Sequence, residues 1–126
     1  MSSLFPPEDN HALSIDDFNK PNIRFIIAEK NSVPCGCGAL AIKSNYGELK
    51  SIYVDEISRG NGIGDLIMMG LEAEAKRLSL KKLYLETGAN LLAAISLYKK
   101  FDFKECGPFG EYKESPHSFF MSKKIK

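Results

Sequence analysis

Residues 53–64 read YVDEISRGNGIG, and this stretch decides how the rest of the sequence is interpreted. Gly60, Gly62 and Gly64 let the backbone turn tightly and remove side chains that would block a close approach. An apolar pattern with helical spacing follows, so the first helical turn presents N–H groups at the positive end of the helix dipole. Such an arrangement binds phosphate, and Arg59 adds a positive charge beside it.

The residues after the loop argue against two other nucleotide-binding motifs. A P-loop ends in Gly-Lys-Ser or Gly-Lys-Thr, whereas Gly64 is followed by Asp65. A dinucleotide fingerprint, G-x-G-x-x-G, would need a glycine where Ile67 stands. On the glycines alone, a plain turn that binds nothing is as good an interpretation as a phosphate site.

Three strands are predicted upstream of the loop, at residues 22–29, 35–43 and 48–54. Because they are short and joined by tight turns, they indicate an antiparallel meander. Before them, residues 1–13 are predicted as a loop. Ser14 and Asp17, three residues apart, predict a short capped helix over residues 15–19.

Downstream of the loop, apolar residues recur at helical spacing over residues 62–78. A strand at 82–86 and a second helix from Asn90, its predicted cap, to Lys100 come next. Two further strands are predicted at 103–106 and 118–123. The order β-β-β-α-β-α-β-β, preceded by the short N-terminal helix, predicts an α+β fold with a mixed central sheet flanked by helices. The strand–helix–strand segment over residues 48–86 should form a right-handed parallel crossover.

Composition points to one soluble domain over residues 1–126. The formal charge of +1 predicts no strong surface field, so neither nucleic acid nor an anionic membrane is an expected partner. No apolar stretch is long enough to cross a bilayer, and the N-terminal residues do not read as a secretory signal. We therefore expect a cytoplasmic protein. Cys35, Cys37 and Cys106 are predicted to be structural thiols, the first two on one apolar strand face, with no metal site.

Several motifs in order resemble one family. Arg59-x-x-Gly62-x-Gly64, after a strand that ends at Val54, resembles the pyrophosphate-binding motif of the GNAT N-acetyltransferase superfamily. The resemblance continues through residues 86–90 and 94–103 and covers about residues 22–126. One departure is Asp102, where the family usually has glycine before a phenylalanine, so a strained turn is expected there.

The resemblance implies acetyl-CoA as co-substrate and no metal. The residues it implies for CoA binding come from the strand end, the glycine loop and the second helix: Ile52, Tyr53, Val54, Arg59, Gly60, Asn61, Gly62, Ile63, Gly64, Asp65, Asn90 and Tyr98. The implied reaction is transfer of the acetyl group to a primary amine, by direct attack in a ternary complex. The acceptor is either a small-molecule amine or a protein lysine.

Three residues are candidates for the chemistry of acetyl transfer. In the resemblance, a carboxylate at the position of Glu48 acts as general base in some members, and an exposed strand-end glutamate is the alternative interpretation. A bulged strand would leave the N–H of Val54 free to stabilise the thioester oxygen. The Tyr98 hydroxyl can protonate the leaving thiolate, and a packed core aromatic is its alternative.

The family normally opens with a strand and a helix before the matching region, and the sequence predicts that this chain lacks both. The strand at residues 22–29 would then be an exposed sheet edge, which predicts a homodimer. Loss of the same elements would also fit a non-catalytic module that binds or senses acyl-CoA.

Overall fold

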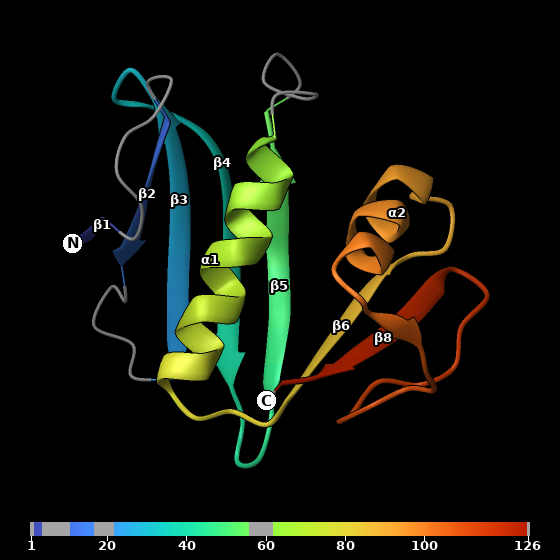
Figure 1. Ribbon diagram of the computed structural model, residues 1–126. Coiled ribbons are helices and arrows are strands. Elements are labelled where there is room, and N and C mark those ends of the chain that lie inside the picture. Colours follow the sequence, from blue (N-terminus) through green and yellow to red (C-terminus); the bar gives the residue numbers. More distant parts are fainter. Residues whose placement is uncertain (1, 4–10, 17–21, 56–61, 126) are drawn as a thin grey trace.

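The computed structural model describes residues 2–3, 11–16, 22–55 and 62–125. Within these residues one mixed sheet has the strand order β1-β2-β3-β4-β5-β6-β8-β7, with two helices (Figure 1). The elements are β1 (Ser2–Ser3), β2 (His11–Asp16), β3 (Ile23–Lys30), β4 (Val33–Ile42), β5 (Gly47–Val54), α1 (Ile63–Arg77), β6 (Lys82–Gly88), α2 (Leu92–Lys100), β7 (Lys104–Glu105) and β8 (Ser118–Lys124). The α+β class and the mixed sheet predicted from the sequence are confirmed.

The predicted meander is present as β3, β4 and β5, which pair antiparallel in sequence order. The register of β3 and β4 shifts after Ala28, which lies opposite Gly36, while Glu29 lies opposite Pro34. Cys35 is the extra residue of this bulge, and it joins the buried core. Cys37 is only half-buried, so the prediction that the two thiols share one apolar face is wrong, because the bulge interrupts the strand alternation.

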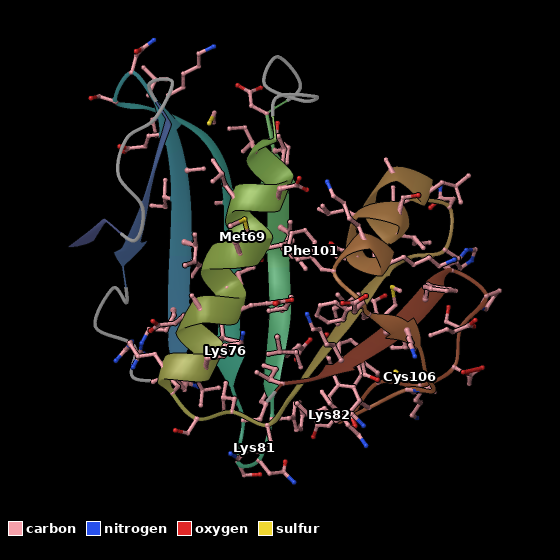
Figure 2. The ribbon with its side chains drawn as sticks, viewed as in Figure 1. Met69, Lys76, Lys81, Lys82, Phe101 and Cys106 are labelled. Atoms are coloured by element: carbon pink, nitrogen blue, oxygen red, sulfur yellow. The ribbon has the colours of Figure 1, made fainter. Side chains whose placement is uncertain are left out.

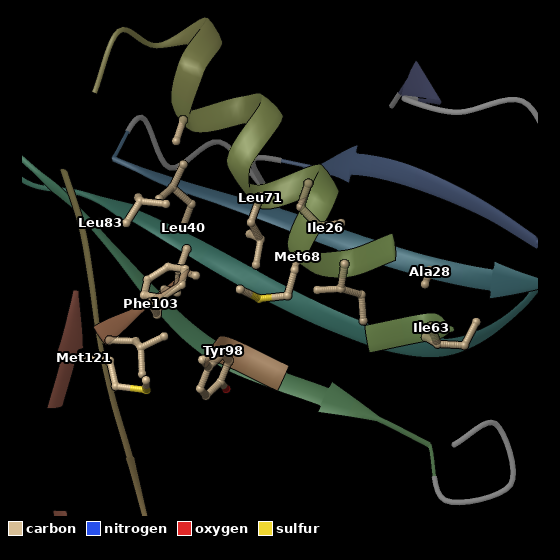
Figure 3. Close-up of a cluster of buried hydrophobic side chains, with 14 of the residues drawn as sticks. Ile26, Ala28, Leu40, Ile63, Met68, Leu71, Leu83, Tyr98, Phe103 and Met121 are labelled. Carbon is tan, nitrogen blue, oxygen red and sulfur yellow. The ribbon is translucent and has the colours of Figure 1, made fainter. Parts of the chain in front are cut away.

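Helix α1 packs closely across β3, β4 and β5 (Figure 1). Its apolar stripe, predicted from the helical spacing, is fully buried at Ile67 and Leu71. Gly36 and Gly38 of β4 make this approach possible, because a Cβ at either position would lie 2.9 Å from an atom of Ile67. Figure 3 shows the resulting core, in which side chains of α1 interdigitate with those of β3, β4 and β6.

The parallel crossover joins β5 to β6, and its ladder is short. The paired positions are Gly47 with Leu83, Glu48 with Tyr84 and Leu49 with Leu85. Beyond Leu49 the two strands diverge, and β6 continues instead in a seven-position antiparallel ladder with β8. Helix α2 follows β6 and lies on the far side of the opening from β5 (Figure 1).

The opposite face of the sheet carries an aromatic cluster. The Tyr84 ring stacks on Phe109 at a centroid distance of 4.7 Å, and Phe109 also contacts Tyr46, Tyr112 and Phe120. Phe109 and Tyr112 belong to the segment between β7 and β8, so this cluster holds that segment against the sheet. The cluster therefore covers the face opposite to α1.

The N-terminal region differs from the sequence prediction. Residues 11–16 form β2, which pairs antiparallel with β3 from His11–Lys30 to Asp16–Phe25, where a loop and a capped helix were expected. Tertiary pairing overrides the local capping signal at Ser14, and the rest of the predicted helix lies outside the described residues. Since β2 covers β3, the exposed edge on which the homodimer prediction rested is not present.

The predicted strain at Asp102 is confirmed. Asp102 has a φ of 69° and is the left-handed residue that ends α2. The Asp102 N–H donates to Lys99 O, and the Phe103 N–H donates to Tyr98 O, which together form a Schellman motif. The ring centroids of Tyr98 and Phe103 lie 6.3 Å apart, so the motif also fixes the position of Tyr98.

Glu74 is a buried carboxylate on α1, with 1% of its side chain exposed. It accepts hydrogen bonds of 2.8 and 2.6 Å from Arg77 and lies 3.3 Å from Arg24 Nε. The Arg77 hydrogen bonds hold its pKa below the ordinary value of 4.5, against the opposing effect of burial. Stability from this lowered pKa is present above 4.5 and is lost as the pH falls through the folded-state pKa.

We expect Glu74→Gln to lower the free energy of unfolding at neutral pH by roughly 1–3 kcal/mol, because a buried carboxylate loses charge-assisted hydrogen bonds. In urea titrations the difference from the parent protein should shrink in acid, where Glu74 is protonated. Glu72→Gln is the matched control, since Glu72 pairs with Lys123 at a more exposed position and should matter less. A constant difference at all pH values would contradict this assignment.

Candidate active site

A β-bulge in β5 builds the two sides of the site. Ala39 lies opposite Lys50 and Cys37 lies opposite Tyr53, so two residues of β5, Ser51 and Ile52, face the single residue between them in β4. Ser51 has a φ of 55°, which lets the strand accommodate the extra residue. Because of it, Leu49 and Ile52 both pack toward the core, although they are three apart in the sequence.

A pocket of about 840 Å³ lies where β5 diverges from β6, between the N-terminal ends of α1 and α2. Its lining contains most of the residues predicted for CoA binding: Ile52, Tyr53, Val54, Gly62, Ile63, Gly64, Asp65, Asn90 and Tyr98. Arg59, Gly60 and Asn61, also predicted, lie outside the described residues. The pocket is large enough for a substantial part of a cofactor-sized molecule.

The N-terminus of α1 opens directly onto this pocket. Gly62 is the N-cap residue with a φ of 78°, and no side chain caps the first turn within the described part of the chain. Among the described residues, a Cβ at Gly62 would meet nothing within 4 Å, so none of them covers the backbone there. The N–H groups of this turn are therefore available to an anionic ligand. This is the chemistry that a pyrophosphate requires.

Two contacts keep α2 close to α1 at the pocket. A Cβ at Gly64 would lie 3.1 Å from Leu97, so glycine permits the close approach of the two helices. Lys100 Nζ donates to Asp65 Oδ2 at 2.6 Å. Lys100 also lines the pocket, although the sequence analysis did not select it. Its position, at the last residue of the predicted helix, gave no signal of that contact.

Asn90 lines the pocket but does not cap α2 as predicted. The N-cap residue is Leu91, without a side-chain hydrogen bond to the helix. Leu91 N–H donates instead to Gly88 O, so the chain turns tightly from β6 before the helix begins. The helix starts one residue later than the sequence suggested, because this turn uses residues 88–91.

The sequence left open whether Tyr98 is a packed core aromatic or a residue of the CoA pocket, and its position fits both. It is a buried core residue, 6% exposed, and it also lines the pocket. Figure 3 shows it beside Phe103 and Met121. Burial raises the pKa of Tyr98, so the hydroxyl stays protonated at neutral pH and can act as a proton donor. Val54 lies opposite Gly36 and lines the same pocket, and its role as an oxyanion donor stays a prediction.

Glu48 lies at the base of the opening, on the face opposite to α1. It is only 4% exposed, which excludes the interpretation as a solvated strand-end carboxylate. The Tyr112 hydroxyl donates to Glu48 Oε2 at 2.6 Å, and Lys43 Nζ lies 4.0 Å from Oε1. Burial and the hydrogen bond to Glu48 raise the pKa of Tyr112, so this hydroxyl also remains a donor.

A second pocket, of about 550 Å³, surrounds Glu48. It is lined by Lys43, Ser44, Tyr46, Glu48, Lys50, Gly110, Glu111 and Tyr112. The sequence analysis missed the lysines and Tyr112. Tyr112 lies 64 residues from Glu48 in the chain, and only the tertiary fold of the segment before β8 brings them together.

No group of three or more histidine, cysteine, aspartate or glutamate side chains with metal-binding geometry exists among the described residues. The three cysteines are free thiols. Neither α1 nor α2 is long and apolar enough to cross a membrane.

The chain belongs to the GNAT family of acetyltransferases, whose family model matches residues 1–103. A curated relative, IAA acetyltransferase of Azospirillum brasilense, is 40% identical over 127 aligned positions, covering 99% of this chain and 83% of the relative.

Solved structures support the same fold. An acyl-CoA N-acyltransferase structure from Klebsiella pneumoniae superposes with a TM-score of 0.87 at 23% identity, covering 94% of this chain and all of that one. A GNAT acetyltransferase of Elizabethkingia anophelis, solved with acetyl-CoA bound, gives a TM-score of 0.77 at 19% identity and covers 94% of this chain and 100% of that chain. Because both identities are below 25%, these similarities show a shared fold alone.

We expect Gly62→Val to weaken CoA binding by about tenfold or more. A β-branched residue strongly disfavours the left-handed conformation at Gly62, so the first turn of α1 would shift. Gly62→Asn is the matched control, because asparagine tolerates that conformation. The measurement is the rise in melting temperature that CoA produces in each variant. The rise is taken relative to the same variant without CoA, so that a change in stability alone does not affect it. Equal rises in both variants would show that the ligand does not use this turn.

Proposed function

We propose that this protein transfers the acetyl group of acetyl-CoA to a primary amine, by direct attack within a ternary complex. The observation that carries the proposal is the arrangement around the divergence of β5 and β6. The pocket at the α1 N-terminus opens from one side of β5, and the buried Glu48 lines the pocket on the other. A donor and an acceptor could therefore meet at the opening between the strands.

On the donor side, the uncapped turn at Gly62 supports binding of the CoA pyrophosphate. The rest of the pocket is lined largely by apolar side chains and strand backbone from Ile52 to Val54, which suits the pantetheine arm. Arg59, Gly60 and Asn61 remain proposed contacts on the basis of the motif. Acetyl-CoA is a co-substrate in this scheme, and no metal is required.

On the acceptor side, Glu48 supports deprotonation of the attacking amine. An alkylamine is mostly protonated at neutral pH and must lose a proton before it attacks the thioester. A buried carboxylate in a pocket can accept that proton directly or through one water. The Tyr112 hydroxyl orients the carboxylate by occupying Oε2, which leaves Oε1 facing the acceptor.

Tyr98 supports the departure of CoA. As the C–S bond breaks, the sulfur gains negative charge, and a neutral hydroxyl in the same pocket can protonate it. Burial keeps Tyr98 in the required neutral form. The Schellman motif at Asp102 and the packing against Phe103 hold its ring in place.

Release of free CoA thiol tests the proposal most directly. Purified protein is incubated with acetyl-CoA and a panel of primary amines, and thiol release is followed together with the mass of the acetylated amine. The competing function is a module that binds acyl-CoA without catalysis. Stabilisation by acetyl-CoA with no amine-dependent thiol release across the panel would favour that module.

We expect Tyr98→Phe to lower turnover by about 10²-fold while the affinity for CoA changes little. The hydroxyl is needed only when the thiolate leaves, so its loss affects the transition state and not ground-state binding. Steady-state kinetics and calorimetric titration with CoA measure the two effects separately. If the Tyr98→Phe variant keeps full turnover while the chemical step is rate-limiting, the Tyr98 side chain serves only packing.

We expect Glu48→Gln to lower turnover by roughly 10²-fold near neutral pH and to recover partly as the pH rises. Without the carboxylate, the reaction depends on the small fraction of amine that is already deprotonated, and this fraction grows with pH. The measurement is kcat/KM as a function of pH for both proteins. If kcat/KM depends on pH in the same way in both proteins, Glu48 takes no part in proton transfer.

A further inference from the structure

The pocket around Glu48 contains an unsatisfied hydrogen-bond acceptor. Oε2 accepts the hydrogen bond from Tyr112 at 2.6 Å, but the nearest cation to Oε1 is Lys43 Nζ at 4.0 Å, beyond hydrogen-bonding distance. Among the described residues, no donor reaches Oε1. Buried carboxylate oxygens are normally hydrogen-bonded, so this oxygen identifies the place of an incoming donor. An ammonium or amine group fits there, since it donates and carries complementary charge.

The charges around Glu48 set a second requirement for a ligand in this pocket. Lys43 and Lys50 line the same pocket, together with one more carboxylate, that of Glu111. When a ligand ammonium pairs with Glu48, the lining keeps two lysines and the carboxylate of Glu111, while the Glu86 carboxylate acts on Tyr112 from outside the lining. The two lysines are the cationic groups of the lining, and they attract a second ligand group only if that group is anionic. A diamine or polyamine would place its second ammonium near the lysines and be repelled.

We propose that the acceptor is an amine that also carries a carboxylate, of the size of an amino acid. This inference rests on the proposed acetyl transfer and specifies its acceptor. The amine donates to Glu48 Oε1, and the carboxylate accepts from Lys43 or Lys50. The pocket volume of about 550 Å³ accommodates a molecule of this size.

The spacing favours a carboxylate close to the amine. Lys43 Nζ lies only 4.0 Å from Glu48 Oε1, so one small ligand can touch both groups. An α-amino acid, in which one carbon separates the amine from the carboxylate, has that compactness. The hydroxyl-bearing rings of Tyr46 and Tyr112 form the remaining walls and face the ligand side chain. The reaction breaks the thioester C–S bond and forms the amide C–N bond. Glu48 passes one proton of the ammonium to solvent, Tyr98 gives its proton to the leaving thiolate, and the second proton lost by the nitrogen restores the Tyr98 hydroxyl through solvent.

Matched pairs of acceptors test the carboxylate requirement. Alanine, leucine, phenylalanine and lysine are each compared with their own carboxamide, which has the same shape and lacks the negative charge. Benzylamine and spermidine serve as acceptors without a carboxylate. We expect kcat/KM to be at least about tenfold higher for the preferred amino acid than for its carboxamide, as for the gain of a charge-assisted hydrogen bond.

Variants of the two lysines test which of them contacts the ligand carboxylate. Lys43→Gln and Lys50→Gln should each reduce the ratio of kcat/KM between the amino acid and its carboxamide, and the double variant should bring it close to unity. The ratio cancels any disturbance of Glu48 that affects both acceptors equally. Lys76→Gln is the control, because Lys76 lies exposed on α1, on the other face of the sheet (Figure 2), and should leave the ratio unchanged.

The outcomes separate this inference from the proposed function. Equal or faster acetylation of carboxamides, benzylamine or spermidine would overturn the carboxylate requirement while leaving acetyl transfer intact. A ratio that is unchanged in the double lysine variant would overturn the assigned contacts. Absence of thiol release with every amine would instead overturn the proposed function itself.

Discussion

The divergence of β5 from β6 is the constraint on which the rest of the structure depends. Parallel strands normally continue their ladder, yet here the pairing stops after Leu49 and Leu85. Past that point the strands leave a space between them, and backbone polar groups there need other partners. The space becomes a pocket because α1 begins on one side of it and α2 on the other. The larger pocket thus arises from an interruption of the sheet.

Such an opening requires support, and the structure supplies it away from the ladder. The two halves of the sheet share one core through α1, whose residues pack with those of α2, β6 and β8. Polar contacts reinforce the connection, since Glu72 of α1 accepts from Lys123 of β8 at 2.8 Å and Asp65 accepts from Lys100 of α2. The Asp65–Lys100 contact lies at the opening and the Glu72–Lys123 contact lies beside the paired end of the ladder, so β5 and β6 can stay apart without separating the domain.

Local signals in the sequence predicted most of this fold. The meander, the long helix and the strand after it follow from periodicity and turn residues, and the glycine loop located the larger pocket. What the sequence could not reveal depended on long-range pairing. Residues 11–16 join the sheet because β3 offers an edge, which no local pattern at Ser14 encodes. The Tyr112–Glu48 contact arises only when the segment before β8 folds back. The bulge at Ser51 could not be predicted from the sequence either, because serine has no particular preference for a positive φ.

The bulge at Ser51 has an evolutionary consequence. Strand residues alternate between faces, so an uninterrupted β5 would commit every second position to the same side along its whole length. The extra residue divides the strand into two segments whose alternation is independent. Glu48 and Lys50 before the bulge face one pocket, while Ile52 and Val54 after it face the other. Mutation can therefore change the side chains that line the smaller pocket through the first segment and leave those that line the larger pocket, in the second, untouched.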